Sequence, residues 1–209
     1  MSFDEDFRRK LREGLKAKRG HAGYFNWNAD RDLEELGVIQ ELWASMNASR
    51  EVFFTDFSIR GRGNDPPDLE ALTLEGEKLA IEVTELVDGQ AIQRDKFVRD
   101  QQNSTWQDRL SVAVSWDDAS IIGEVQKLIK AKDGKFNKLL GGPYRGGYCV
   151  VIFTDEPDLS PEKLQGVLQG ATFLAENISR CLLLIGYQPF EQHLKYIDLV
   201  LKKPQDCNF

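Results

Sequence analysis

The sequence has few of the residue patterns that mark the common catalytic and metal sites. Its two histidines, His21 and His193, stand alone, so neither a zinc site nor a histidine-based triad is expected. It has no phosphate-binding P-loop, no GxSxG nucleophile motif and no dinucleotide-binding fingerprint. These absences disfavour zinc enzymes, serine hydrolases and the nucleotide-binding folds that carry such motifs.

Cysteine and long apolar runs are also scarce. The three cysteines have neither CxxC nor Cys/His spacing, and Cys149 and Cys181 lie within apolar runs, which is typical of buried free thiols in a reducing compartment. No apolar run approaches the ~18 residues that cross a bilayer. The first ten residues, MSFDEDFRRK, are charged and no apolar stretch follows them, which disfavours a secretory signal. We therefore expect a soluble, cytoplasmic protein without a membrane partner.

Positive charge is in deficit over the chain as a whole. The net charge is -7 and the pI is about 5.0, whereas a surface that binds phosphates needs local positive charge. A bound metal ion or a cluster of basic residues could supply that charge. One such cluster lies in the first twenty residues, which predict a short basic helix that is either a solvated face or a phosphate-binding arm.

The overall composition is that of an ordinary folded domain. The 209 residues are 41% hydrophobic and 29% charged, which suits one domain with a modest extension. A glycine-rich break at residues 20–23 separates the basic helix from the rest of the chain. We therefore divide the chain into a basic N-terminal helical extension, residues 1–29, and a domain over residues 30–209.

Hydrophobic periodicity predicts a helix and then three strands in the first half of that domain. Asp30 is a suitable N-cap for the helix. Its apolar stripe repeats at helical spacing and consists of Leu36, Ile39, Trp43 and Met46. The strands are expected at residues 51–61, 67–74 and 78–86. Short connections between them indicate an antiparallel meander.

The second half predicts a further alternation of helices and strands. Helices are expected after Asp88, at residues 119–136 behind an Asp117 or Asp118 cap, and from Ser160 to about Glu176. Strands are expected at residues 109–116, 146–157, 180–189 and 196–203. This order predicts the α/β class, with a mixed β-sheet flanked by helices.

One pair of acidic residues stands out against this pattern. Asp68 begins the second strand of the meander, and Glu82 lies fourteen residues later among the apolar residues of the third. A carboxylate inside an apolar strand is costly unless a partner compensates its charge. A hairpin through residues 75–77 would bring the two carboxylates together, where Mg²⁺ or Mn²⁺ could bind both. An edge-strand pair of solvated acids is the alternative.

The order of the elements resembles the core of the PD-(D/E)xK nucleases, the superfamily with the restriction-endonuclease-like fold. The resemblance rests on Pro67-Asp68 in one strand, on Ile81-Glu82-Val83-Thr84 in the next, and on the order of elements over residues 30–154. The TDEP turn and the LLLIGYQP strand are similar to segments of uncharacterised bacterial members. The resemblance implies that Asp68 and Glu82 are metal ligands at a site that hydrolyses phosphodiester bonds.

One position departs from the family pattern. The family places a lysine two residues after the glutamate, where this chain has Thr84. A hydroxyl can position a water but brings no positive charge. Lys96 could reach the site from the next helix, as migrated lysines do in some relatives, Thr84 could act with a second metal ion, or the site could be inactive. Many relatives carry a further acid on the first helix, and Glu35 is favoured over Glu41 as that third metal ligand, with an ordinary surface charge as the alternative for either.

Several basic residues could contact nucleic acid near this site. Arg60 and Arg62 alternate with glycines just before the Pro-Asp strand. Glycine lets a backbone approach a phosphate and arginine binds phosphate in bidentate fashion, although a plain turn explains the segment equally well. Lysines around the helix at residues 119–136, including Lys127 and Lys130, could meet a nucleic-acid backbone or could form a solvated face.

Three functions are compatible with these patterns. The leading one is a Mg²⁺- or Mn²⁺-dependent endonuclease that cuts DNA, or RNA, and a homodimer is a common assembly among nucleases that cut both strands. The second is a catalytically inactive nuclease-like module that binds nucleic acid or a protein partner. The third is an unrelated α/β enzyme that acts on a small molecule, because fold resemblance does not fix function.

Overall fold

The computed structural model describes residues 31–61, 63–100, 115–186 and 193–204, and for residues 95, 96 and 98–100 it describes the backbone alone. The helices are α2 (Arg31–Ser49), α3 (Gly89–Asp100), α5 (Asp118–Asp133), α6 (Pro161–Leu168) and a short 3-10 helix, η1 (Phe136–Lys138). The strands are β1 (Phe54–Ile59), β2 (Leu69–Thr73), β3 (Lys78–Glu85), β4 (Gly147–Thr154), β5 (Phe173–Leu174), β6 (Arg180–Ile185), β7 (Lys195–Leu199) and β8 (Leu201–Lys202).

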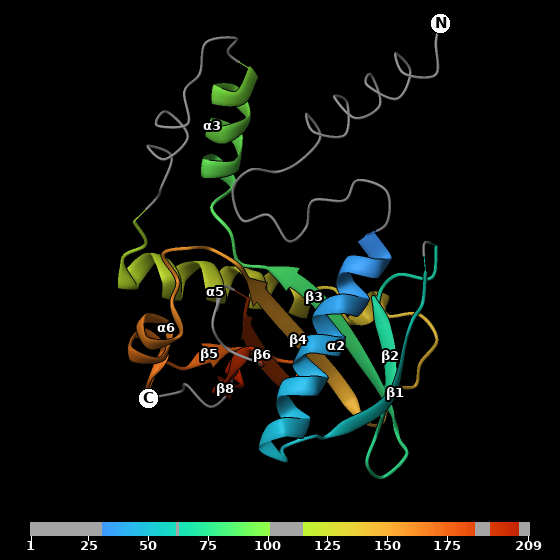
Figure 1. Cartoon of the computed structure of the whole chain (residues 1–209). Coiled ribbons are helices and arrows are strands. Elements are labelled where there is room, and N and C mark those ends of the chain that lie inside the picture. The colour runs from blue at the N-terminus through green and yellow to red at the C-terminus, as the bar shows by residue number, and fades with distance from the viewer. Residues whose placement is uncertain (1–30, 62, 101–114, 187–192, 205–209) are drawn as a thin grey trace, which may run out of the picture.

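A six-stranded mixed sheet with the order β1-β2-β3-β4-β6-β7 forms the centre of the fold (Figure 1). The first three strands pair antiparallel, which confirms the predicted meander. Strands β4 and β6 then join parallel to β3, and β7 closes the order antiparallel to β6. Parallel neighbours need a long crossover connection, and in this chain those connections carry the helices α3, α5 and α6. The predicted α/β class with a mixed sheet flanked by helices is therefore confirmed.

Helices cover both faces of this sheet. Helix α2 lies across one face, and α5 and α6 pack on the other (Figure 1). The alternation of β3 follows this division, because Leu79, Ile81 and Val83 join the core under α2 whereas Ala80 joins the core under α5. Glu82 shares the face of Ala80, so its carboxylate belongs to the α5 side.

The buried face of α2 is turned slightly from the predicted one. Ile39 and Met46 are fully buried as expected, but Leu36 and Trp43 lie at the edge of the core. Val38 and Leu42 are fully buried in their place. This rotation brings Glu35, at 6% exposure, onto the buried face.

The predicted helix starts after residue 116 are confirmed, but one helix end is not. Asp117 is the N-cap of α5 and its side chain accepts a hydrogen bond from the Ser120 amide at 2.7 Å. Ser160 caps α6 in the same way. The expectation that this helix runs to about Glu176 is wrong, because Gly170 takes a positive φ of 80° just after the helix and β5 follows.

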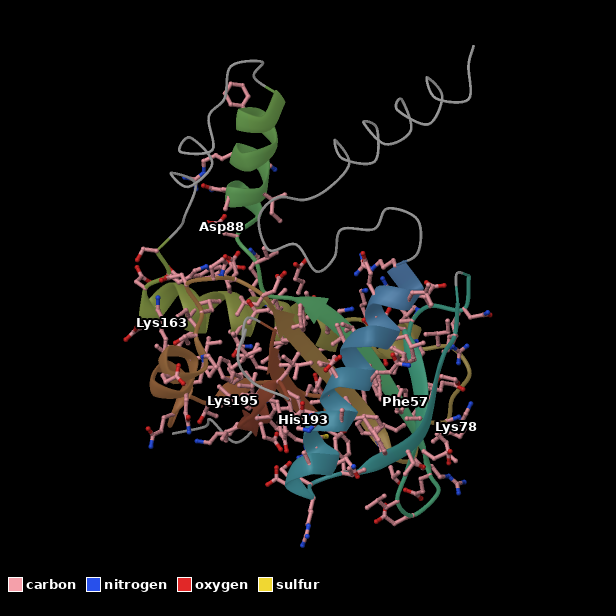
Figure 2. The ribbon with its side chains drawn as sticks, viewed as in Figure 1. Phe57, Lys78, Asp88, Lys163, His193 and Lys195 are labelled. Atoms are coloured by element: carbon pink, nitrogen blue, oxygen red, sulfur yellow. The ribbon has the colours of Figure 1, made fainter. Side chains whose placement is uncertain are left out.

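Helix α3 projects from the end of β3 (Figures 1 and 2). Asp88 at its foot accepts hydrogen bonds from the backbone amides of Gln90 and Ala91 at 2.7 and 3.0 Å, which confirms the helix predicted after this residue. The N-terminal extension, the Asp30 cap and nearly all of the predicted strand at residues 109–116 lie outside the described residues.

Candidate functional site

A tight hairpin sets the two predicted acids opposite each other. Gly76, with a φ of 80°, lets the chain turn, and its amide donates to the Thr73 carbonyl at 2.9 Å. The resulting register pairs Leu69 with Ile81, so Asp68 stands opposite Glu82 one step further along the ladder. Asp68 Oδ2 also accepts a hydrogen bond from the Val83 amide at 2.7 Å, which fixes the orientation of this carboxylate.

Three carboxylates gather at this point. Asp65, Asp68 and Glu82 each offer an oxygen, and these oxygens all lie within 4.8 Å of one another. Glu82 is fully buried, and its Oε1 has no hydrogen-bond partner among the described residues. A buried carboxylate oxygen without a donor is an expensive arrangement that a hard divalent cation relieves. The donor set therefore fits Mg²⁺ or Mn²⁺, the ions expected from the sequence.

A lysine from α5 supplies positive charge to this cluster. Lys132 is buried, its Nζ donates to Glu82 Oε2, and it lies 3.7 Å from Asp68 Oδ2. The Lys135 Nζ lies 3.7 Å from the same Glu82 oxygen. Thr84 brings no positive charge to Glu82. Lys132 of α5 and Lys135, which follows that helix, bring it instead.

Lys132 was expected only as one of the lysines around α5 that could meet a nucleic-acid backbone, and Asp65 was not expected to be a site residue, yet both left a signal in the sequence. Ile121, Val125 and Ile129 form the buried stripe of α5, and Lys132 continues that stripe three residues later. A lysine on the apolar face of a helix needs a buried acidic partner, which is the inference that would have found it. Asp65 gave a weaker signal, because a single acid in a proline-rich turn is usually solvated.

Burial changes the proton affinity of two carboxylates here. It raises the pKa of Asp68 to about 7, and the Lys132 ammonium opposes this rise whereas the neighbouring Glu82 carboxylate adds to it. Burial also raises the pKa of Glu35, against the hydrogen bond that it accepts from Arg31. Both acids therefore hold a proton more readily than an exposed carboxyl does.

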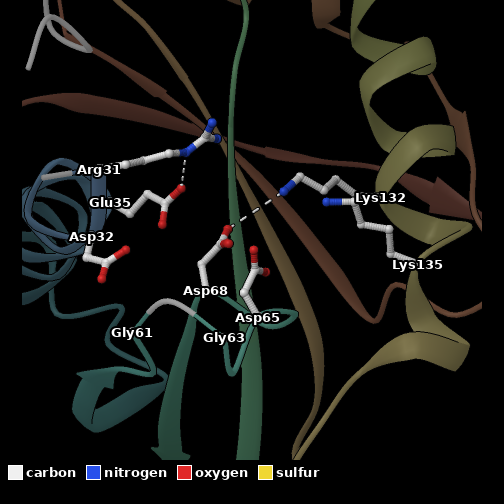
Figure 3. A pocket seen from close by; sticks show the side chains of 9 residues that line it. All are labelled: Arg31, Asp32, Glu35, Gly61, Gly63, Asp65, Asp68, Lys132 and Lys135. Carbon is white, nitrogen blue, oxygen red and sulfur yellow. Dashed lines mark hydrogen bonds and ion pairs between the residues drawn. The ribbon is translucent and has the colours of Figure 1, made fainter. Parts of the chain in front are cut away.

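The acidic cluster opens into a pocket of about 340 Å³ (Figure 3). Its walls come from the start of α2, the loop before β2 and the end of α5, and they consist of Arg31, Asp32, Glu35, Gly61, Gly63, Asp65, Asp68, Lys132 and Lys135. Glu35, predicted as a third metal ligand, lines this pocket but is not one of the three clustered acids. Its Oε1 accepts a 2.6 Å hydrogen bond from Arg31 Nε instead.

The roles expected for Thr84 and Lys96 at the attacking water stay predictions. Thr84 follows Glu82 by two residues on the same face of β3, but it is not among the residues that line the pocket. Lys96 belongs to α3, and its side chain lies outside the part of the chain that the structure describes.

Of the two arginines before β2 that were predicted to contact nucleic acid, the structure describes Arg60. Arg60 is half-buried, and its guanidinium donates to Glu70, to the Tyr144 hydroxyl at 2.9 Å and to the Asn64 carbonyl at 2.9 Å. These contacts tie the loop before β2 to the loop before β4. Arg62 lies outside the described residues.

The predicted lysines of α5 are on its solvent side. Lys127 and Lys130 are exposed, and Lys127 pairs with Glu124 at 3.0 Å. Lys127 lines a different pocket, near the start of α3. It comes eight residues before Lys135, which lines the pocket beside the acids. The structure therefore does not bring these two lysines to the acidic cluster.

No helix among the described residues is long and apolar enough to cross a membrane. No protein-family model, no curated protein and no solved structure matches this chain.

Proposed function

We propose that this chain is a divalent-metal-dependent nuclease of the PD-(D/E)xK kind, with a restriction-endonuclease-like fold. Asp65, Asp68 and Glu82 would hold Mg²⁺ or Mn²⁺, and Lys132 would take the part of the family's lysine. The observation that carries the proposal is the meeting of a buried lysine from α5 with the carboxylate pair of the β2–β3 hairpin, where one Glu82 oxygen lacks a donor.

The chemistry of the residues supports hydrolysis of a phosphodiester. A divalent ion at this place would lower the pKa of a water and offset charge on the phosphate. The Lys132 ammonium has three donors, so it can hold Glu82 and still donate to the oxygen of an attacking water or of a phosphate. The Val83 amide holds Asp68 in the orientation that faces Glu82. Because its own motif position is Thr84, this chain would recruit its cation from a helix, as a migrated lysine does.

Cleavage assays on wild type and three matched variants test the proposal. Single-stranded DNA, duplex DNA and RNA are incubated with Mg²⁺, with Mn²⁺ and with EDTA. We expect metal-dependent cleavage by wild type and a loss of at least a hundredfold in Asp68→Asn, Glu82→Gln and Lys132→Met. Glu162→Gln removes an exposed acid of α6 and serves as the control. Cleavage that survives both carboxylate substitutions would contradict the site assignment.

One observation favours a second function, an inactive nuclease-like module that binds nucleic acid or a protein partner. The Lys132 ammonium already compensates Glu82 and lies close to Asp68, so the buried charges are partly balanced without an ion. Titration of Mn²⁺ by calorimetry separates the two functions. Saturable binding that Asp68→Asn abolishes supports the nuclease, and its absence with retained binding of nucleic acid supports the module.

A further inference from the structure

Two cationic side chains of the pocket differ from Lys132 in their access to solvent. The side chain of Lys132 is 9% exposed, whereas those of Lys135 and Arg31 are 45% and 68% exposed. The buried Lys132 ammonium contacts Glu82 and Asp68 and therefore compensates the carboxylates at the centre of the site. Lys135 and Arg31 instead reach solvent, where an incoming anion first meets the pocket.

Arg31 is held in an orientation that leaves most of its donors available. Its Nε donates to Glu35 Oε1 at 2.6 Å, and the Glu35 side chain is 8% exposed and therefore fixed in place. Among the contacts of the described residues, neither terminal nitrogen of Arg31 has a partner, and both point away from Glu35 (Figure 3). A guanidinium oriented at Nε presents its remaining N–H groups in the planar fork that matches a phosphate.

Lys135 stands on the opposite wall of the same pocket. It follows the end of α5 (Figure 3). Its Nζ lies 3.7 Å from Glu82 Oε2. Asp65, Asp68 and Lys132 lie between Lys135 and Arg31, which comes from the start of α2 (Figure 3). The acids repel a polyanion, and cations on both walls offset this repulsion where a phosphate chain approaches the metal centre.

We propose that Arg31 and Lys135 bind two backbone phosphates of the nucleic-acid substrate, one on each side of the metal centre, and that Glu35 is a positioning residue for Arg31. This inference rests on the proposed nuclease function and adds the path of the bound strand, from α2 to the segment after α5. It also assigns to Glu35 a role other than metal binding.

The salt dependence of binding tests the two phosphate contacts directly. Fluorescence anisotropy with short labelled oligonucleotides is measured in Ca²⁺, an ion with the same preference for oxygen ligands, between about 50 and 200 mM salt. We expect Arg31→Gln and Lys135→Gln each to weaken binding several-fold. Each should also lower the slope of log K against log salt by roughly 0.7 to 0.9, the value for one lost phosphate contact.

Lys195→Gln is the matched control for Lys135→Gln. Lys195 lies on β7, away from the pocket, and its side chain is 51% exposed and 3.6 Å from Glu162 (Figure 2). It therefore matches Lys135 in exposure and in ion pairing, and its substitution should leave both the affinity and the slope unchanged.

A double-mutant cycle tests the positioning role of Glu35. Glu35→Gln should weaken oligonucleotide binding in the wild-type background but have no effect in the Arg31→Gln background. The dissociation constant for Mn²⁺ should stay within about twofold in Glu35→Gln, because Glu35 is outside the acidic cluster. A large loss of Mn²⁺ affinity would overturn this role and return Glu35 to the metal ligands.

The outcomes separate this inference from the nuclease proposal. If wild type cleaves nucleic acid but the two variants keep the wild-type slope, the phosphate contacts are wrong and the nuclease stands. If wild type binds without cleaving and the slopes fall, the contacts stand and the nuclease does not. If wild type neither binds nor cleaves any oligonucleotide, both are overturned.

Discussion

At the scale of single residues, the Lys132 ammonium compensates the negative charge of the acidic centre. Its ammonium group contacts Glu82 and lies 3.7 Å from Asp68, and all three side chains are buried or nearly so. A buried ion pair adds little net stability, because desolvation offsets most of the attraction. Removing one partner is different, since the remaining charge then has nothing to compensate it.

We expect Lys132→Met to destabilise the metal-free protein by roughly 3 to 5 kcal/mol at pH 8. Methionine has about the volume of the lysine stem, so the loss reflects the uncompensated carboxylates more than a cavity. The loss should be smaller at pH 5, because Asp68, whose pKa is raised to about 7, is protonated there. Urea unfolding in EDTA at both pH values measures the effect. An equal loss at both would show that Lys132 acts through packing alone.

The raised pKa of Asp68 predicts a pH dependence of stability. Its pKa is about 7 in the folded protein and near 3.8 when unfolded, so the folded state binds the extra proton. That contribution is complete below about pH 4 and is lost as the pH rises through 7. In EDTA, the stability of wild type relative to Asp68→Asn should therefore fall between pH 5 and pH 8. A difference that rises over this range would contradict the raised pKa.

Part of the site could be predicted from single residues and part could not. The strand alternation around Glu82 and the hairpin spacing are local, so they indicated that Asp68 and Glu82 would meet. Lys132 is fifty residues from Glu82 in the chain, and its contact depends on how α5 crosses the sheet. The roles expected for Thr84 and Arg60 stay predictions, because Thr84 is not among the residues that line the pocket and the Arg60 guanidinium is engaged by Glu70, Tyr144 and Asn64.

At the scale of elements, the end of α5 is anchored by Asp133. Its carboxylate accepts hydrogen bonds from three successive backbone amides, those of Glu176, Asn177 and Ile178, at 2.8 to 3.1 Å. Asp133 is the neighbour of Lys132, and the Tyr148 hydroxyl donates to the Lys132 carbonyl at 3.0 Å. These hydrogen bonds fix the last turn of α5. The position of this turn determines where the Lys132 ammonium lies.

Asp133→Ala should cost roughly 1 to 3 kcal/mol of stability, because it leaves three amides without their acceptor. It should also lower cleavage, since the last turn of α5 loses an anchor and Lys132 is less firmly placed. Asp133→Asn, which keeps an acceptor oxygen, should recover most of both losses. Chemical denaturation and the cleavage assay report the two effects. Full activity in a destabilised Asp133→Ala would show that Lys132 does not depend on this anchor.

Sequence predicted the elements best where their signals were local. The meander, β4, β6 and the caps of α5 and α6 were predicted from alternation, apolar runs and capping residues. The two-residue strands β5 and β8 were not distinguished, because residues 173 and 174 pair with residues 201 and 202, far along the chain. The prediction of an overlong α6 has a local cause, because Gly170, which takes a positive φ just after the helix, was not read as its end.

At the scale of the whole molecule, metal binding should be visible as stability. A ligand that binds only the folded state stabilises it by about 2.7 kcal/mol at a hundred times its Kd, which is a Tm rise of about 5 to 10 °C for a chain of this size. We expect Mn²⁺ to raise the Tm of wild type at pH 8 and to raise it less at pH 6, because below pH 7 a proton competes for Asp68.

Differential scanning fluorimetry with increasing Mn²⁺ at the two pH values measures this linkage, and Glu162→Gln again serves as the control. Asp68→Asn and Glu82→Gln should abolish the Tm rise while remaining folded, because each replaces a carboxylate by an amide of nearly the same shape. An equal Mn²⁺ effect in these variants would place the ion elsewhere on a protein whose net charge of -7 attracts cations generally. The pH dependence separates the two, since attraction to scattered surface carboxylates hardly changes between pH 6 and pH 8.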